Sequence, residues 1–234
     1  MKEPLAPGGA PTLVFDLDGT LAETAPDLMK ALNYVLAGEG VPALPLAAAR
    51  RLLGAGGRAL IKRGFAEHHR TLDAATLEKL FAKFLAYYND HIADETRLMP
   101  GVAECLDRSA KAGWRLAVCT NKLEHSTRLL LGELGVLDRF AFVCGQDTVG
   151  VGKPDPKPLI EAIRRAGGDV KRAVMVGDSH VDVEIARAAG APVVLVDFGY
   201  TDKPAAELGA DRVIASFDAL PAAAAALIGE RAAG

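Results

Sequence analysis

Four short runs of apolar residues lie along the chain, and a polar residue or glycine follows each of them. The runs cover residues 13–15, 116–119, 173–176 and 193–196. Continuous apolar runs of this length are typical of strands that are buried on both faces of a sheet. Segments with helical character separate the later runs, at about 101–112, 124–134, 156–167 and 180–189. This alternation of strand and helix predicts an α/β fold with a parallel sheet.

Residues 23–95 show helical periodicity and little strand character, with a glycine-rich joint at 53–58. The clearest predicted helices cover residues 27–36, 59–68 and 74–88. We therefore expect two domains: a core of residues 1–22 and 96–234, and an inserted all-helical cap of residues 23–95. The insertion begins beside the end of the first strand, so it is expected to overhang that end as a lid. The alternative is a helical subdomain that only adds core.

Asp16, Thr120 and Asp178 stand at the carboxyl ends of three of the predicted strands. The carboxyl ends of parallel strands meet at one edge of a sheet, where ligands bind, so these side chains are expected to converge. Asp16 and Asp18 also form a pair of carboxylates that can bind a divalent cation and supply a nucleophile. On these residues alone, an acidic turn is an equal alternative, because Asp and Gly are common turn residues.

Composition narrows the possible partners. The 234-residue chain has a net charge of −3, which makes no electrostatic case for nucleic acid or an anionic membrane as partner. Its three cysteines have no metal-binding spacing, and an unpatterned, odd count is typical of a reducing compartment. We see no signal peptide and no apolar stretch that could cross a bilayer, so a cytoplasmic location is expected. The stretch from Glu3 to Pro11 is expected to be a disordered tail.

Four motifs in this sequence resemble, in order and spacing, those of the haloacid dehalogenase superfamily in its phosphatase form. They are DLDGT at 16–20, TNK at 120–122, GKP at 152–154 and GDSHVD at 177–182. The resemblance covers about residues 12–21 and 97–220, and the helical insertion stands where that family places its cap. It implies a Rossmann-like parallel sheet core with an inserted helical cap.

The resemblance also implies catalytic roles. Asp16 is the nucleophile that forms an aspartyl-phosphate, and Asp18 is the general acid and base. Mg²⁺ is the implied cofactor, with Asp16, the backbone carbonyl of Asp18 and Asp178 as its ligands. Asp182 is expected to support the metal from behind these ligands or through water.

Substrate contacts are expected from four further residues. The resemblance implies that Thr120 donates a hydrogen bond to the phosphoryl group, and Asn121 is placed beside it as a binding residue. Lys153 is expected to neutralise phosphoryl charge and to orient Asp16. Arg58, beside the glycine-rich cap loop, could pair with a substrate carboxylate, although a solvated surface arginine is an equal alternative. Tyr87 and Tyr88 are interpreted as packing within the cap.

Finer resemblance points to phosphoglycolate phosphatase-like members of the superfamily. It lies at residues 21–28, 53–60 and 198–200, with one departure: Glu23-Thr24 stands where an Asp-Ser pair is common. The retained Asp18 favours phosphoryl transfer over dehalogenation. The expected partner is a small phosphorylated metabolite, with 2-phosphoglycolate as the first candidate. The alternatives are an inorganic pyrophosphatase, a sugar-phosphate phosphatase or phosphomutase, and a non-catalytic ligand-binding member. Whether the chain is a monomer or a homodimer stays open.

Overall fold

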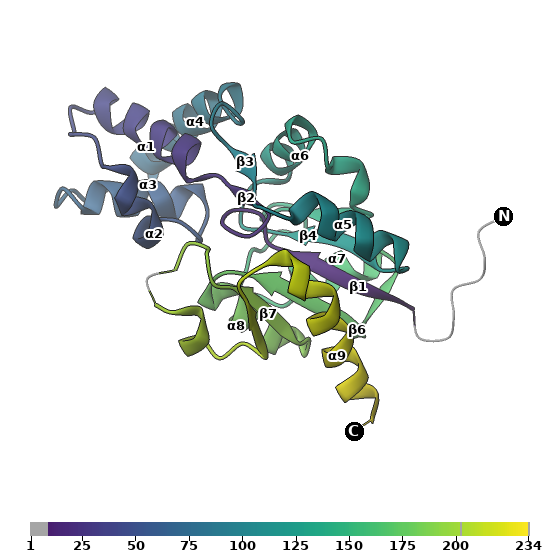
Figure 1. Ribbon diagram of the computed structural model, residues 1–234. Coiled ribbons are helices and arrows are strands. Elements are labelled where there is room, and N and C mark those ends of the chain that lie inside the picture. The colour runs from purple at the N-terminus through teal and green to yellow at the C-terminus, as the bar shows by residue number, and fades with distance from the viewer. Residues whose placement is uncertain (1–8, 202, 234) are drawn as a thin grey trace.

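A six-stranded parallel sheet forms the centre of the computed structural model, which describes residues 9–201 and 203–233 (Figure 1). The strand order is β5-β4-β1-β6-β7-β8, and each neighbouring pair is parallel. The strands are β1 (Ala10–Phe15), β4 (Arg115–Cys119), β5 (Phe142–Cys144), β6 (Gly168–Gly177), β7 (Val193–Val196) and β8 (Arg212–Ile214). This arrangement confirms the predicted α/β fold class.

The strand β1 occupies an inner position because its side chains are apolar towards both faces of the sheet. Leu13 and Phe15 belong to one core cluster and Val14 to the other, and all three are fully buried. Burying one such side chain stabilises the fold by about 1.5–3 kcal/mol. Helices α5, α6 and α9 contribute to the first cluster, and α7 and α8 to the second. These helices are α5 (Val102–Lys111), α6 (Glu124–Glu133), α7 (Lys157–Arg165), α8 (His180–Ala189) and α9 (Leu220–Ala233).

Four more helices, here called the cap helices, lie together beyond the carboxyl ends of the strands (Figure 1). They are α1 (Ala25–Gly38), α2 (Ala49–Leu52), α3 (Gly57–Ala66) and α4 (Ala74–Asp90). A Cβ atom at Gly64 would lie 2.7 Å from Cδ1 of Leu32, so the glycine lets α3 approach α1 closely. All four helices fall within the expected cap of residues 23–95, whose exact limits stay a prediction.

Two short linker strands join the cap helices to the sheet. Strand β2 (Ala22–Glu23) pairs with the antiparallel strand β3 (Arg97–Leu98). Beside them, Asp27 in the first turn of α1 accepts hydrogen bonds from the backbone N–H groups of Glu95 and Thr96, at 2.9 and 2.8 Å. The chain therefore leaves and re-enters the sheet region through two segments that are tied to each other.

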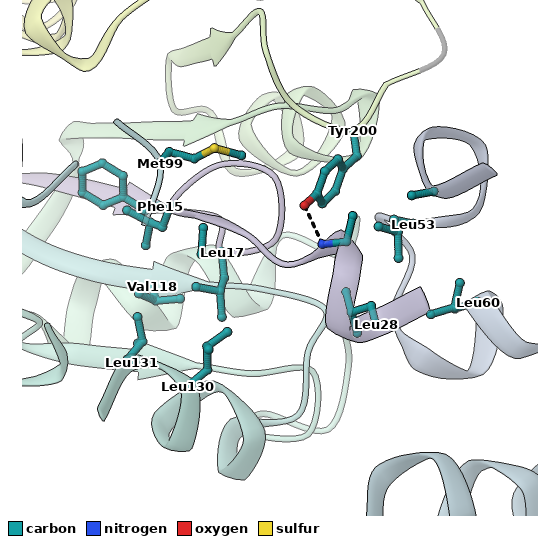
Figure 2. Packing of buried hydrophobic residues seen from close by; sticks show 14 of the residues in the cluster. Phe15, Leu17, Leu28, Leu53, Leu60, Met99, Val118, Leu130, Leu131 and Tyr200 are labelled. Atoms are coloured by element: carbon teal, nitrogen blue, oxygen red, sulfur yellow. Dashed lines mark hydrogen bonds between the residues drawn. The ribbon is translucent and has the colours of Figure 1, made fainter. Parts of the chain in front are cut away.

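The apolar core continues from the sheet into the cap helices. Figure 2 shows part of this cluster, with Phe15, Val118, Leu130 and Leu131 from the sheet side and Leu28, Leu53 and Leu60 from the cap segment. Separating the two parts would expose this apolar surface to water, which is unfavourable. The shared core therefore holds the cap helices over the carboxyl edge of the sheet.

The structure differs from the sequence expectations mainly at the edges of the sheet. Strands β5 and β8 were not predicted, and neither were the linker strands β2 and β3. Residues 3–8 of the expected tail lie outside the described residues, whereas Ala10 and Pro11 already belong to β1, so the expected tail was too long. No helix in the described part of the chain combines the length and apolar character that a membrane span requires.

Candidate active site

Asp16 and Asp18 lie where the chain leaves β1. The backbone N–H of Asp16 donates a 2.8 Å hydrogen bond to the carbonyl of Val176 in β6, so Asp16 extends the ladder of the sheet. Gly19 then turns the chain with a φ of 81°. A Cβ atom at Gly19 would lie 2.5 Å from Oδ2 of Asp178. Glycine is therefore required for this turn to pass so close to a second carboxylate.

Three buried carboxylates converge beside this turn: Asp16, Asp178 and Asp182. An oxygen of each lies within 4.8 Å of an oxygen of the other two. Burial is the main cause that raises the pKa of Asp16 to about 6, and Lys153 opposes that rise. Burial also raises the pKa of Asp178 well above its usual range, with the charges of Asp182 and Asp16 as further causes. Burial is therefore the first cause that disfavours the charged forms of Asp16 and Asp178, and the neighbouring carboxylates add to it.

Lys153 supplies the positive charge inside the cluster. Its Nζ lies 3.0 Å from Oδ2 of Asp16 and 2.7 Å from Oδ1 of Asp182, and only 1% of its side chain is exposed. Burial lowers the pKa of this ammonium, but the two carboxylates raise it more, and the net pKa lies above its usual value. Asn121 holds the Lys153 backbone by accepting from its N–H at 2.9 Å and donating to its carbonyl at 3.3 Å. The amide of Asn121 therefore faces Lys153, and its predicted contact with substrate stays a prediction.

Asp182 is occupied by contacts within the protein. Its Oδ2 accepts from the backbone N–H groups of Asp178 and Ser179, both at 3.1 Å, and from Oγ of Ser179 at 2.9 Å. The bond from the Ser179 N–H is one half of a capping box at the start of α8. With Lys153 on its other oxygen, Asp182 orients its neighbours and has little capacity left for a direct ligand role.

Asp178 follows β6 and is held from two sides. Its Oδ1 accepts from Oγ1 of Thr20 at 3.1 Å, and its Oδ2 accepts from the backbone N–H of Tyr200 at 2.5 Å. Gly199 makes the second contact possible, because a Cβ atom there would lie 2.1 Å from the Cβ of Asp178. Each oxygen keeps a free lone pair, so Asp178 can still bind a cation.

A pocket opens between this edge of the sheet and the cap helices. Asp16, Asp18 and Thr120 line it on the sheet side. The cap side is mostly apolar and consists of Leu28, Leu53, Gly54, Gly56, Gly57, Leu60, Phe81, Phe84, Leu85 and Tyr88. The glycine-rich joint at 53–58 therefore reaches the pocket through Leu53, Gly54, Gly56 and Gly57. A few polar side chains on one wall of a pocket and apolar side chains on the opposite wall are typical of a ligand-binding site.

Lys122 connects the two walls of this pocket. Its Nζ lies 3.1 Å from Oδ1 of Asp18 on the sheet side and 3.0 Å from the hydroxyl of Tyr88 on α4. The Nζ also stands 4.5 Å from the centroid of the Tyr88 ring. Burial is the main cause that raises the pKa of Tyr88 to about 12, against the opposing charge of Lys122, so the hydroxyl stays neutral at ordinary pH.

Arg58 lies away from the pocket lining. Its guanidinium makes two 2.7 Å hydrogen bonds to the carboxylate of Glu78 on α4 and stacks 3.8 Å above the ring of Phe81. The side chain is 43% exposed. The structure therefore places Arg58 in an exposed ion pair next to Phe81, and its expected contact with a substrate carboxylate remains a prediction.

Sequence reasoning missed the roles of three residues that shape the site: Tyr88, Lys122 and Tyr200. Lys122 stands inside the TNK motif and Tyr200 inside the matched stretch 198–200, so the family resemblance already marked both positions. No motif marked Tyr88, which the sequence showed only as an aromatic residue on a predicted cap helix. It does pack within the cap, as expected, with its ring stacked 5.9 Å from that of Phe84, but its hydroxyl also reaches the core.

Known proteins resemble this chain over most of its length. The model of the haloacid dehalogenase-like hydrolase family matches residues 10–190. The phosphoglycolate phosphatase of Mesorhizobium japonicum is 50% identical over 210 residues, which cover 90% of this chain and 92% of that protein. The phosphoglycolate phosphatase of Caulobacter vibrioides is 47% identical over 217 residues, covering 93% and 92%.

Solved structures agree with these relatives. A predicted phosphoglycolate phosphatase from Haemophilus somnus 129PT has a TM-score of 0.84 at 28% identity and covers 91% of this chain and 96% of that one. CbbY from Rhodobacter sphaeroides, solved in complex with phosphate, has a TM-score of 0.77 at 30% identity and covers 90% and 96%. The motifs, the parallel sheet and the convergent carboxylates thus agree with the similarity, and this chain belongs to the haloacid dehalogenase-like hydrolases as a phosphoric monoester hydrolase.

Proposed function

We propose that this phosphatase depends on Mg²⁺ and hydrolyses 2-phosphoglycolate through an aspartyl-phosphate on Asp16. The observation that carries the proposal is the convergence of Asp16 and Asp178 beside Lys153, together with a pocket that Asp16 and Asp18 line. The names of the phosphoglycolate phosphatases from Mesorhizobium japonicum and Caulobacter vibrioides support 2-phosphoglycolate as the substrate.

The donor set fits a magnesium ion. Asp16 and Asp178 offer carboxylate oxygens with free lone pairs, and burial raises the pKa of both, so a bound cation would favour their charged forms. Mg²⁺ prefers hard oxygen ligands of this kind together with waters. Asp16, Asp178 and the backbone carbonyl of Asp18 would hold the ion. When bound, it supplies positive charge that offsets the charge of the phosphoryl group.

Asp16 is oriented for attack on phosphorus. Its Oδ1 accepts a 2.7 Å hydrogen bond from the backbone N–H of Leu17, and its Oδ2 faces Lys153 at 3.0 Å. The attack forms a bond between a carboxylate oxygen of Asp16 and phosphorus and breaks the bond from phosphorus to the ester oxygen. Lys153 offsets part of the charge on the phosphoryl group, and the hydroxyl of Thr120, which lines the pocket, would donate a hydrogen bond to it.

Asp18 moves the protons. In the first step it gives a proton to the ester oxygen, because an alkoxide is a poor leaving group. In the second step it takes a proton from the water that attacks phosphorus, which releases inorganic phosphate and restores the carboxylate of Asp16. The position of Asp18, in the wall between Asp16 and the apolar cap side, suits contact with the leaving group.

A substrate panel tests the proposal. The purified chain is assayed with 2-phosphoglycolate, inorganic pyrophosphate, glucose 6-phosphate, β-glucose 1-phosphate and phenyl phosphate, each with Mg²⁺ and with excess chelator. We expect the highest kcat/KM for 2-phosphoglycolate, no turnover in chelator, and none in Asp16→Asn. Acid quenching during turnover should leave one phosphoryl group on the peptide that contains Asp16.

Other rankings contradict the proposal in distinct ways. A higher kcat/KM for pyrophosphate or a sugar phosphate would replace the substrate. Full turnover in chelator would remove the metal from the mechanism. Substantial turnover by Asp16→Asn would remove the nucleophile assignment.

A further inference from the structure

Lys122 has an unusual position in the pocket. Among the described residues that line it, Lys122 is the only one with a positive charge. Lys153 lies against Asp16 and Asp182, and Arg58 pairs with Glu78 in an exposed contact, and neither belongs to the lining of this pocket. An anionic group on the leaving-group side of the substrate would therefore find its charge partner at Lys122.

The geometry around Lys122 fixes where that partner lies. The side chain is 7% exposed, and its Nζ stands between Asp18 on the core and Tyr88 on the cap. Asp18 must contact the ester oxygen to protonate it. A group bonded to that oxygen therefore extends from Asp18 into the space beside Lys122, where the apolar wall excludes water.

Lys122 can give up its contact with Asp18 for a contact with a substrate carboxylate. Oδ1 of Asp18 is buried and accepts no well-aligned hydrogen bond, although Nζ of Lys122 is 3.1 Å away. The aligned hydrogen bond of this ammonium goes to the hydroxyl of Tyr88 instead, at 3.0 Å. An ammonium has three donors, so Lys122 can keep its bond to Tyr88 while it donates to an incoming carboxylate.

We propose that Lys122 is the specificity-determining residue that recognises the carboxylate of the substrate, and that Tyr88 positions it from the cap. This inference rests on the proposed function. In 2-phosphoglycolate one carbon separates the ester oxygen from the carboxylate carbon, so a molecule whose ester oxygen faces Asp18 brings its carboxylate to Lys122. Charge-assisted hydrogen bonds are the strong ones, and a site shielded from water strengthens them further.

The role of Tyr88 follows from its packing. It lies at the end of α4, 1% exposed, in a row of stacked rings with Phe84 and Phe81. This row fixes the hydroxyl, and the hydroxyl and the ring face together hold the ammonium of Lys122. Recognition of the carboxylate would thus be complete only when the cap helices lie over the sheet edge.

The test compares 2-phosphoglycolate with ethyl phosphate, which has the same ester oxygen and no carboxylate. The measured quantity is the ratio of kcat/KM for the two esters. In Lys122→Met, which keeps the length of the side chain, we expect this ratio to fall by about tenfold or more, mainly through KM for 2-phosphoglycolate. Lys122→Arg should retain more of the ratio because it keeps the charge.

Two cap variants separate positioning from packing. Tyr88→Phe removes only the hydroxyl and should lower the ratio by a smaller factor than Lys122→Met. Tyr87→Phe is the matched control on the same helix, since Tyr87 stacks with Tyr34 outside the pocket, and it should leave the ratio unchanged. Circular dichroism and thermal melting check that each variant is folded.

A binding measurement removes any effect of Lys122 on proton transfer. In the Asp16→Asn background, calorimetry with 2-phosphoglycolate and with inorganic phosphate should show that Lys122→Met weakens only the first. Equal loss for both ligands, or an equal loss of kcat/KM for both esters, would overturn the proposal and leave Lys122 as support for Asp18. A fall of the ratio in Arg58→Met but not in Lys122→Met would also overturn it, in favour of Arg58.

The wild-type protein keeps the two proposals distinguishable. If it does not prefer 2-phosphoglycolate over ethyl phosphate but prefers another carboxylate-bearing phosphoester, such as 3-phosphoglycerate, the proposed substrate fails. The Lys122 variants are then compared on that ester, and a fall of its ratio still supports the inference. If no carboxylate-bearing ester is preferred, the inference fails even where the phosphatase activity stands.

Discussion

Tyr200 joins the candidate metal ligand Asp178 to the base of the cap. Its backbone N–H donates a 2.5 Å hydrogen bond to Oδ2 of Asp178. Its hydroxyl accepts from the backbone N–H groups of Thr24 and Ala25 at 2.7 and 2.8 Å, where α1 begins, and donates to Glu23. Figure 2 shows the hydroxyl of Tyr200 directed at this backbone. One residue thus fixes both the carboxylate of Asp178 and the start of the first cap helix.

Tyr200→Phe should loosen the cap without disturbing Asp178, because only the hydroxyl is lost. The backbone N–H of Thr24 would lose its acceptor, whereas that of Ala25 would keep Glu23 Oε1 at 3.2 Å. Leaving one such buried group without a partner costs about 1–3 kcal/mol of unfolding free energy. Urea unfolding measures this loss, and hydrogen exchange should rise in β2 and the first turn of α1. Tyr34→Phe, at an exposed tyrosine of α1, is the control. An unchanged unfolding free energy would contradict the linking role.

Asp18→Asn should slow the enzyme in a manner that depends on the leaving group. An alkyl ester needs a proton from Asp18 in the first step, whereas an aryl phosphate releases a more stable phenolate. We expect the single-turnover rate of phosphoryl transfer to fall by about 10²–10⁴-fold for 2-phosphoglycolate and by clearly less for 4-nitrophenyl phosphate. If both esters lose the same factor in this step, Asp18 is not the general acid.

Mg²⁺ should stabilise the folded protein through Asp16 and Asp178. At a concentration of about 100 times its Kd, a bound ligand adds about 2.7 kcal/mol, which for a chain of this size raises Tm by about 5–10 °C. Asp178→Asn should abolish the Mg²⁺-dependent rise in a thermal melt. Asp197→Asn, at an exposed carboxylate after β7, should keep it. A full rise in Asp178→Asn would exclude this residue as a ligand.

Asn121→Ala should reduce kcat more than it changes KM. Both polar atoms of the Asn121 amide bond the backbone of Lys153, so the substitution frees the loop that carries this ammonium. Loss of an orienting partner typically costs about 10–100-fold in activity. Steady-state kinetics with 2-phosphoglycolate measure the two constants separately. A large rise of KM with an unchanged kcat would indicate instead that Asn121 binds substrate directly.

The inner strands could be predicted because their burial is visible in the sequence. Residues 13–15, 116–119, 173–176 and 193–196 are apolar at successive positions, as strands covered on both faces require. Strands β5 and β8 have three residues each at the sheet edges, and Arg212 and Val213 of β8 are exposed, so no such pattern marked them. The linker strands β2 and β3 have two residues each and form only where the two ends of the cap insertion meet.

The same contrast holds at the site. The carboxylates Asp16 and Asp178 could be predicted to converge, because parallel strands deliver their carboxyl ends to one edge. No local pattern could show that Arg58 pairs with Glu78, twenty residues away on another helix, or that Lys122 meets Tyr88 across the pocket. Long side chains such as arginine and lysine pair with whichever polar groups lie near them in space. These pairs therefore form only when the cap helices pack against one another and over the sheet.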